Sequence, residues 1–358
     1  SQPELLDQAV RAADRALELD DRLAEAHVSK GAILAHHPPY DTDAAQREFK
    51  RAIELNPRLA NAHRELGLLL LRKMGRVEEG LAELLTTDEL EPFWSLSKDH
   101  LAEAFAANGD VAGAVATLRE YQELDPAYEE TANILASMVL QDFEVAERLV
   151  EELVEGSVSD FRRAALFLAL NGRTAEAAAF VDRFLHLKPN AERSHGTAGV
   201  VALLAGEFQP AVHHLEQSSR LAGHPVQALV PVSFSRIYSD NATLIGYARQ
   251  KMGDEDQALR LFGETEQYYT DRIARGDTSF QARVGLAAVH ALRGDREAAY
   301  DWLQQGIDAG FYAHAELERH PCFESLHEEE RFQRMMDVVE ARVEDARRQV
   351  DAIEGVER

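Results

Sequence analysis

The chain has 358 residues, of which 45% are hydrophobic, and its 63 acidic against 38 basic side chains give a formal net charge of −25. Such a charge repels nucleic-acid phosphates, which argues against DNA or RNA binding, and no apolar run approaches the roughly 18 residues of a membrane-spanning helix. The single cysteine, Cys322, excludes an internal disulfide. These features favour a cytoplasmic protein; a periplasmic location stays open if a membrane segment lies upstream, and a salt-adapted source would produce the same acidity.

Residues 3–20 carry the pattern of one amphipathic helix, with Ala9, Ala13 and Ala16 on its packing face. In the frame described next, this segment corresponds to the second helix of a hairpin whose first helix is missing. We therefore expect the chain to be part of a longer protein. The alternative is that the lone helix caps the array.

The rest of the chain repeats a frame built around a glycine. A charged residue follows the glycine directly, a small residue stands five positions later and an apolar residue nine positions later. Such a recurring frame predicts stacked helical hairpins, so the expected fold is all-α, an α-α superhelix. The frame glycines are Gly75, Gly109, Gly172, Gly206, Gly253 and Gly294, and two of the intervals, Gly75 to Gly109 and Gly172 to Gly206, are 34 residues long.

The unit 95–126 shows what each position is expected to do. Gly109 ends the first helix because glycine adopts the left-handed conformation without a Cβ penalty, and Asp110 then caps the second helix. Ala102 and Ala114 are small because the two helices cross there, and Gly199 with Ala211 repeats this pairing.

Eight hairpins are expected within one solenoid spanning 1–358, followed by a closing segment, 311–358, that ends in a helix. Phe311, Phe323, Leu326 and Phe332 are expected to form a hydrophobic plug in the closing segment. An insert at 224–238 contains two prolines, which argue against helix throughout. The hairpins are predicted at 24–57, 60–92, 95–126, 127–156, 158–189, 192–223, 239–274 and 280–310.

The small residues, turn glycines and terminal prolines together resemble the tetratricopeptide repeat (TPR) family over nearly the whole chain. The resemblance implies that the first helices line a concave groove that holds a peptide or a partner helix. The end of the chain resembles the closing segment of TPR regions at the C-termini of bacterial signalling proteins, where the repeats follow a kinase, cyclase or winged-helix domain. That second resemblance is carried by Trp302-Leu303, Gly310-Phe311, Pro321-Cys322-Phe323 and Arg331-Phe332.

No residue pattern indicates chemistry. The turn glycines are single, so no phosphate-binding loop is present. His213 and His214 are adjacent on a helix and point in different directions. Asp41-Thr42-Asp43 lacks the rest of a calcium loop, so this segment is expected to cap the helix that starts near Asp43 instead. No histidine or asparagine frame accompanies Cys322. We predict no catalytic, metal or cofactor site.

The candidate partner-binding residues are those at the groove positions of the first helices. The apolar members favour a hydrophobic or amphipathic peptide, and the alternative is that they pack between neighbouring helices as core. The basic clamp for a C-terminal carboxylate found in chaperone-binding members is absent. The candidates are Arg64, Arg72, Arg162, Leu166, Leu170, Arg193, Val200, Tyr247 and Lys251, beside the acidic Asp99 and Glu103.

Three functions remain open at this point. The favoured one is a non-enzymatic protein–protein interaction module, the C-terminal arm of a larger bacterial regulatory protein. A self-assembling scaffold, in which the unpaired helix at 3–20 completes its hairpin with a second copy, is the alternative, so a homo-oligomer is possible. An enzyme on a solenoid fold fits least, because no polar residues are predicted to converge in a pocket.

Overall fold

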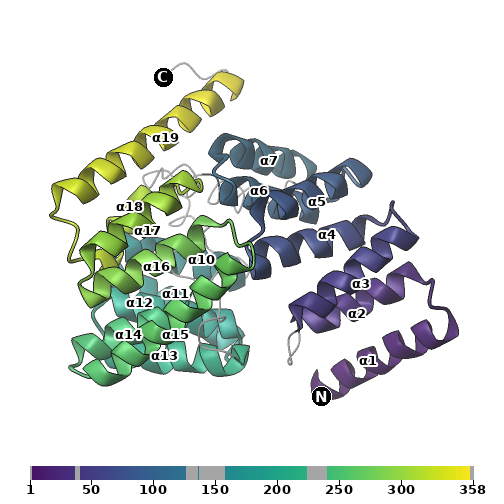
Figure 1. The fold of residues 1–358 in the computed structure, drawn as a ribbon, viewed down its shortest axis with the longest axis horizontal. Helices are drawn as coiled ribbons and strands as arrows, with labels where there is room; N and C mark the ends of the chain where they lie inside the picture. Colours follow the sequence, from purple (N-terminus) through teal and green to yellow (C-terminus); the bar gives the residue numbers. More distant parts are fainter. Residues whose placement is uncertain (1, 37–40, 126–135, 137–157, 224–239, 355–358) are drawn as a thin grey trace.

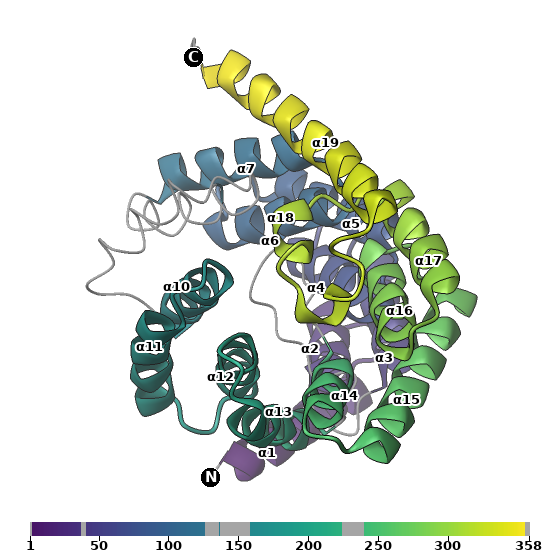
Figure 2. The same cartoon turned by 90° about the vertical axis from the view of Figure 1, so that its left-hand side faces the viewer.

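The computed structural model describes residues 2–36, 41–125, 136, 158–223 and 240–354. Every regular element within these ranges is helical, and successive helices pair as antiparallel hairpins that stack into an α-α superhelix (Figures 1 and 2), which confirms the predicted fold class. The hairpin predicted at 127–156 and the insert at 224–238 lie outside the described residues. The first helix is α1 (Gln2–Leu19), and the described hairpins are α2 (Ala24–His36) with α3 (Thr42–Leu55), α4 (Ala60–Leu69) with α5 (Val77–Leu90), α6 (Ser95–Ala107) with α7 (Val111–Leu124), α10 (Val158–Leu170) with α11 (Thr174–Leu187), α12 (Glu192–Leu204) with α13 (Phe208–Ala222), α14 (Asn241–Lys251) with α15 (Glu255–Ala274), and α16 (Phe280–Arg293) with α17 (Arg296–Asp308).

The hairpin turns form as the frame predicts. All six frame glycines have positive φ angles, between 67° at Gly75 and 84° at Gly253. The Asp110 carboxylate accepts a 2.8 Å hydrogen bond from the amide of Gly113, and the Asp41 carboxylate accepts one of 2.8 Å from Ala44. Both aspartates therefore cap the helices they precede. In the second hairpin a π-helical turn, η1 (Leu70–Met74), extends the first helix up to Gly75.

The small residue of the first helix makes room for the apolar residue nine positions after the turn glycine. A Cβ atom placed on Gly199 would lie 2.6 Å from Leu215, and one on Gly246 would lie 2.5 Å from Phe262. The glycine is required because a large side chain from the second helix fills the space beside it. In the second hairpin the two small residues also meet, because a Cβ atom on Gly80 would lie 3.0 Å from the backbone oxygen of Gly67. The predicted pairing of Gly199 with Ala211 stays a prediction.

A histidine at the fourth position of the first helix recurs in three hairpins. One ring nitrogen, Nε2, lies 2.8–3.1 Å from the backbone oxygen six residues earlier, and Nδ1 lies 2.6–3.0 Å from a side chain of the second helix. Each ring thus joins the loop before a hairpin to both of its helices. The contacts are His27 with Asp21 and Glu48, His63 with Pro57 and Glu83, and His195 with Pro189 and His214.

The superhelix closes on itself, and we call the line of contact the seam. The amide of Thr278 donates a 3.0 Å hydrogen bond to the backbone oxygen of Gly75, and the amide of Val77 donates one of 3.3 Å to the Thr278 hydroxyl. Further along, a Cβ atom on Gly109 would lie only 2.8 Å from the Cα of Gly310. The seam therefore joins the second and third hairpins to the loops on either side of the last one.

The closing segment packs inside the array. It comprises α18 (His314–Leu317), a 3₁₀ turn η3 (Pro321–Phe323) and the long helix α19 (Glu330–Glu354). In Figure 2, α18 lies on the inner side of the superhelix near α6, while α19 runs along α7 and α17. The four plug residues are fully buried, as predicted, and share the largest core cluster with side chains of α7, α12 and α16: Phe311, Phe323, Leu326 and Phe332.

Candidate functional site

The first helix of each hairpin lies on the inner side of the superhelix, with α10, α12 and α14 inside α11, α13 and α15 (Figure 2). The predicted groove residues all belong to these inner helices or to η1. The inner face of the second to sixth hairpins carries a set of basic groups that we call the arginine cluster. Its members are Arg64 and Arg72 on α4 and η1, Arg162 and Arg163 on α10, and Arg193 on α12.

Carboxylates of the same face hold two of these arginines. The Nε of Arg72 donates to one oxygen of Glu103 at 3.2 Å and a terminal guanidinium nitrogen donates to the other at 2.5 Å, so the pair is bidentate and joins the second hairpin to the third. Arg64 forms an ion pair with Glu65 and lies over the ring of Trp94, 5.2 Å from its centroid. Both guanidinium groups are half-buried.

Arg162 and Arg193 lie on the adjacent inner helices. Arg162 is 5% exposed, and its Nε donates a 3.2 Å hydrogen bond to the hydroxyl of Thr197 on α12. Burial, followed by the charges of Arg193 and Arg163, lowers the pKa of Arg162 to about 9. Arg193 is exposed, and no hydrogen bond or ion pair holds its guanidinium within the described part of the chain.

Electrostatic interactions connect the two sides of the cluster. The surrounding protein partly desolvates Arg193 and lowers its pKa, and the next largest cause is the positive charge of Arg72 on η1. His100 on α6 is 8% exposed; burial first, and then the charges of Arg72 and Arg64, lower its pKa to about 3. Its Nδ1 atom has no hydrogen-bond partner. His100 is therefore a neutral, buried ring that faces the arginines.

The predicted apolar groove residues lie in the core. Leu166 and Val200 are fully buried, and Leu170 is 5% exposed, within the largest core cluster. These three side chains therefore pack between neighbouring helices, which was the alternative to groove contacts in the sequence analysis. They give no support for a hydrophobic or amphipathic partner.

Tyr247 and Lys251 on α14 contact the closing segment. Tyr247 is 6% exposed, and the ammonium group of Lys251 lies 5.3 Å from the centroid of its ring. Lys251 also forms a 2.7 Å ion pair with Glu324. The chain's own C-terminal residues therefore cover this part of the inner face.

Two observations describe the metal-ligand and thiol chemistry of the described residues. Within the described ranges, no three histidine, cysteine, aspartate or glutamate side chains are placed to hold a metal ion. Burial, followed by the charge of Asp240, raises the pKa of Cys322 well above its usual value, so its thiol stays protonated. No helix in the described segments is long and apolar enough to cross a membrane.

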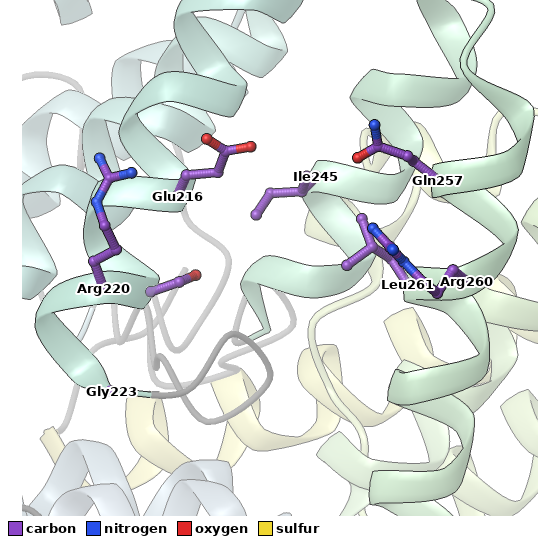
Figure 3. A pocket seen from close by; sticks show the side chains of 8 residues that line it. Glu216, Arg220, Gly223, Ile245, Gln257, Arg260 and Leu261 are labelled. Carbon is purple, nitrogen blue, oxygen red and sulfur yellow. The ribbon is translucent and has the colours of Figure 1, made fainter.

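A separate cavity of about 490 Å³ lies between α13, α14 and α15 (Figure 3). Glu216 and Arg220 border it on one side and Gln257 and Leu261 on the other, with Ile245 between them. Glu216 already pairs with Arg249 at 2.9 Å. The cavity thus combines one carboxylate that is already paired and two arginines, Arg220 and Arg260, with apolar and amide side chains.

Sequence reasoning missed two inner-face residues. His100 and Arg163 each stand at the sixth position of their helix, directly after the groove position occupied by Asp99 and Arg162. Glu65 shares this position and pairs with Arg64. Including the sixth position among the groove positions would have identified all three.

Comparisons with known proteins support repeats of the TPR type. A family model described as tetratricopeptide repeat matches residues 40–88, the segment from α3 to α5 that carries Arg64 and Arg72. A search of curated proteins found no match. The class of protein that the fold and this segment define is therefore an α-α superhelix with TPR-like repeats.

Solved structures similar to the chain are distant from it. The APC/C hetero-tetramer Cut9-Hcn1 is 12% identical, with a TM-score of 0.42; the match covers 93% of this chain and 52% of that one, so the chain spans about half of its length. A TPR protein from Parabacteroides merdae is 14% identical over 79% of this chain and 98% of that one, with a TM-score of 0.43. YrrB, described as a TPR protein with an unusual peptide-binding site, is 16% identical over 61% of this chain and 96% of that one, with a TM-score of 0.30. None of these similarities bears on the predicted resemblance to bacterial signalling proteins.

Proposed function

We propose that the protein is a non-enzymatic protein–protein interaction module that holds a segment of a partner on the inner face of its superhelix. The observation that carries the proposal is the arginine cluster, to which four hairpins contribute side chains. Arg72 pairs with Glu103, and the positive charge of Arg72 helps to lower the pKa of Arg193. Converging polar groups on a rigid concave scaffold are typical of recognition surfaces.

The site differs from the one predicted from sequence. Charged residues form it, while the apolar candidates lie in the core and Tyr247 lies beneath Lys251. The proposal therefore keeps Arg64, Arg72 and Arg193 as partner contacts. Arg162, which is buried against Thr197, serves to position α10 on α12.

Site-specific crosslinking tests the proposal. A photoreactive amino acid replaces Arg193 on the inner face in one protein and Arg260, an exposed residue of α15, in a matched control. After irradiation in cells of the source organism, a partner protein should be crosslinked to the chain at position 193 and not at position 260. That partner, once identified and purified, should bind the chain in calorimetry. Crosslinks of equal yield at both positions, or at 260 alone, would contradict the inner-face assignment.

The finer role, the C-terminal arm of a larger bacterial regulatory protein, belongs to the same proposal and rests on the pattern from Trp302 to Phe332. Reading the full-length gene tests it. An upstream kinase, cyclase or winged-helix domain would support the role, and a gene that encodes only these repeats would remove it.

Self-assembly is kept as a second candidate because α1 packs on α2 and leaves Leu19 71% exposed. A second copy could cover that side chain. Light scattering that finds only a monomer at high protein concentration would eliminate this candidate.

A further inference from the structure

We infer that the arginine cluster binds the carboxylates of an acidic peptide segment. The inference rests on the proposed function and names the chemistry of the partner. It is argued from the charges that face one another on α4, η1, α6, α10 and α12.

The first argument is the balance of charge around Arg193. The whole chain carries a net charge of −25, yet this part of the inner face gathers arginines. The nearby carboxylates already have cationic neighbours: Glu103 is held by Arg72, and Glu65 by Arg64. Asp99 acts on Arg72, and Glu192 acts on both Arg162 and Arg193.

The second argument is that Arg193 is available. Arg193 as a whole is an exposed residue, although its guanidinium is partly desolvated, and within the described residues no hydrogen bond or ion pair holds that group. The charges of Arg72 and Arg163 act on it and favour its loss of a proton. Like charges held this close are stabilised when an anion lies between them, and a guanidinium binds a carboxylate through two parallel hydrogen bonds.

The third argument is the unpaired nitrogen of His100. The side chain is 8% exposed and its Nδ1 lacks a hydrogen-bond partner, although an unsatisfied buried polar atom costs about 1–3 kcal/mol. Arg72 and Arg64 lie close enough to lower its pKa. A neutral imidazole beside two guanidinium groups offers one more donor to a carboxylate that enters between them.

An acidic peptide fits this surface better than a larger polyanion. At physiological salt, charges more than about 8 Å apart are screened, so a short peptide on the inner face is affected mainly by the nearby arginines. An extended nucleic acid would also contact the acidic surface of a chain whose net charge is −25. The cluster also extends from η1 to α12. A short chain with several carboxylates can contact more of it than a single small anion can.

Fluorescence anisotropy with the full 358-residue chain tests the inference. The probe is a fluorescein-labelled peptide of consecutive glutamates, and the reference is a glycine–serine peptide of the same length. We expect the glutamate peptide to bind and the reference peptide not to bind. Replacing Arg193 by glutamine (R193Q) should weaken binding about tenfold, the worth of one charge-assisted hydrogen-bonded pair.

The matched control is R260Q, which removes an exposed arginine from the outer helix α15 and changes the net charge equally. It should leave the affinity unchanged. Circular dichroism melting curves check that both variants fold. Equal affinity for the two peptides, or an equal loss in R193Q and R260Q, would overturn the inference.

Two further results separate this inference from its alternatives. Displacement of the glutamate peptide by inorganic phosphate at equal molar concentration would assign the cluster to a free anion and overturn the peptide assignment. A partner could crosslink at position 193 although R193Q does not weaken its binding and the glutamate peptide does not displace it. That result would support the interaction module and refute its specificity for acidic peptides.

Discussion

The seam predicts that two turn glycines with the same backbone conformation differ in their tolerance of alanine. Gly253 has φ of +84° and open space around its Cα, so G253A should cost only the left-handed strain, about 1–2 kcal/mol. Gly75 has φ of +67°, and a Cβ there would lie 2.2 Å from the carboxylate of Asp277. That carboxylate cannot move aside easily, because Arg272 pairs with it at 2.6 Å and the amide of Ser279 donates to it at 2.8 Å.

G75A should therefore break the seam as well as strain the turn. The contact contains three hydrogen bonds between Thr278 and the turn, one at 3.0 Å and two at 3.3 Å, and each contributes about 1 kcal/mol. The expected loss is about 4–5 kcal/mol, more than twice that of G253A. Urea unfolding followed by circular dichroism measures both variants, and hydrogen exchange at the amide of Thr278 reports the seam directly. If the two variants unfold at the same urea concentration and the Thr278 amide stays protected, the seam does not contribute to stability.

Two other predictions follow from packing and from the buried histidines. G199A should lower the free energy of unfolding by about 1–3 kcal/mol, because the new methyl group meets Leu215 at 2.6 Å. G263A, in an open helical site on α15, should raise it by up to about 1 kcal/mol. Thermal unfolding compares the two variants, and equal shifts in Tm would refute the packing argument. Burial lowers the pKa of His100 to about 3 and that of His214 to about 4, both below the unfolded value of 6.5. Both rings are therefore neutral in the folded protein. Their contribution to the free energy of unfolding is complete above pH 6.5 and is lost as the pH falls toward these two values. At pH 5 His100 should cost about 2 kcal/mol, and His214, which solvent screens more, should cost less. H214Q, which cannot take up the proton, should flatten the dependence of the urea midpoint on pH, and an unchanged slope would contradict the assignment.

Local features of the fold could be predicted because they depend on neighbouring residues. The left-handed turn at Gly109 and the cap at Asp110 follow from a few adjacent positions, and both form as expected. The contact of Gly199 with Leu215 was not predicted, since Ala211 and Leu215 lie on the same face of the second helix and the repeat frame does not say how deeply each side chain reaches.

The candidate site required information that the repeat frame does not contain. Periodicity marks Leu166 as inner-facing but does not say whether the next hairpin covers it, and it is fully buried. The influence of Arg72 on Arg193 depends on the curvature of the superhelix over the 120 positions between them. Curvature accumulates from small rotations between hairpins, and a pattern read one hairpin at a time does not reveal it.

The seam also constrains how this protein can evolve. In an ordinary repeat array each unit contacts only its neighbours, so a unit can be duplicated or deleted and the array simply becomes longer or shorter. Here Thr278 meets Gly75 only if the chain between them completes one turn of the superhelix. Duplication of a hairpin within that interval would carry the loop at Thr278 past its contact. The number of repeats between Gly75 and Thr278 is therefore fixed by geometry. Hairpins added before α2 would leave the contact unchanged.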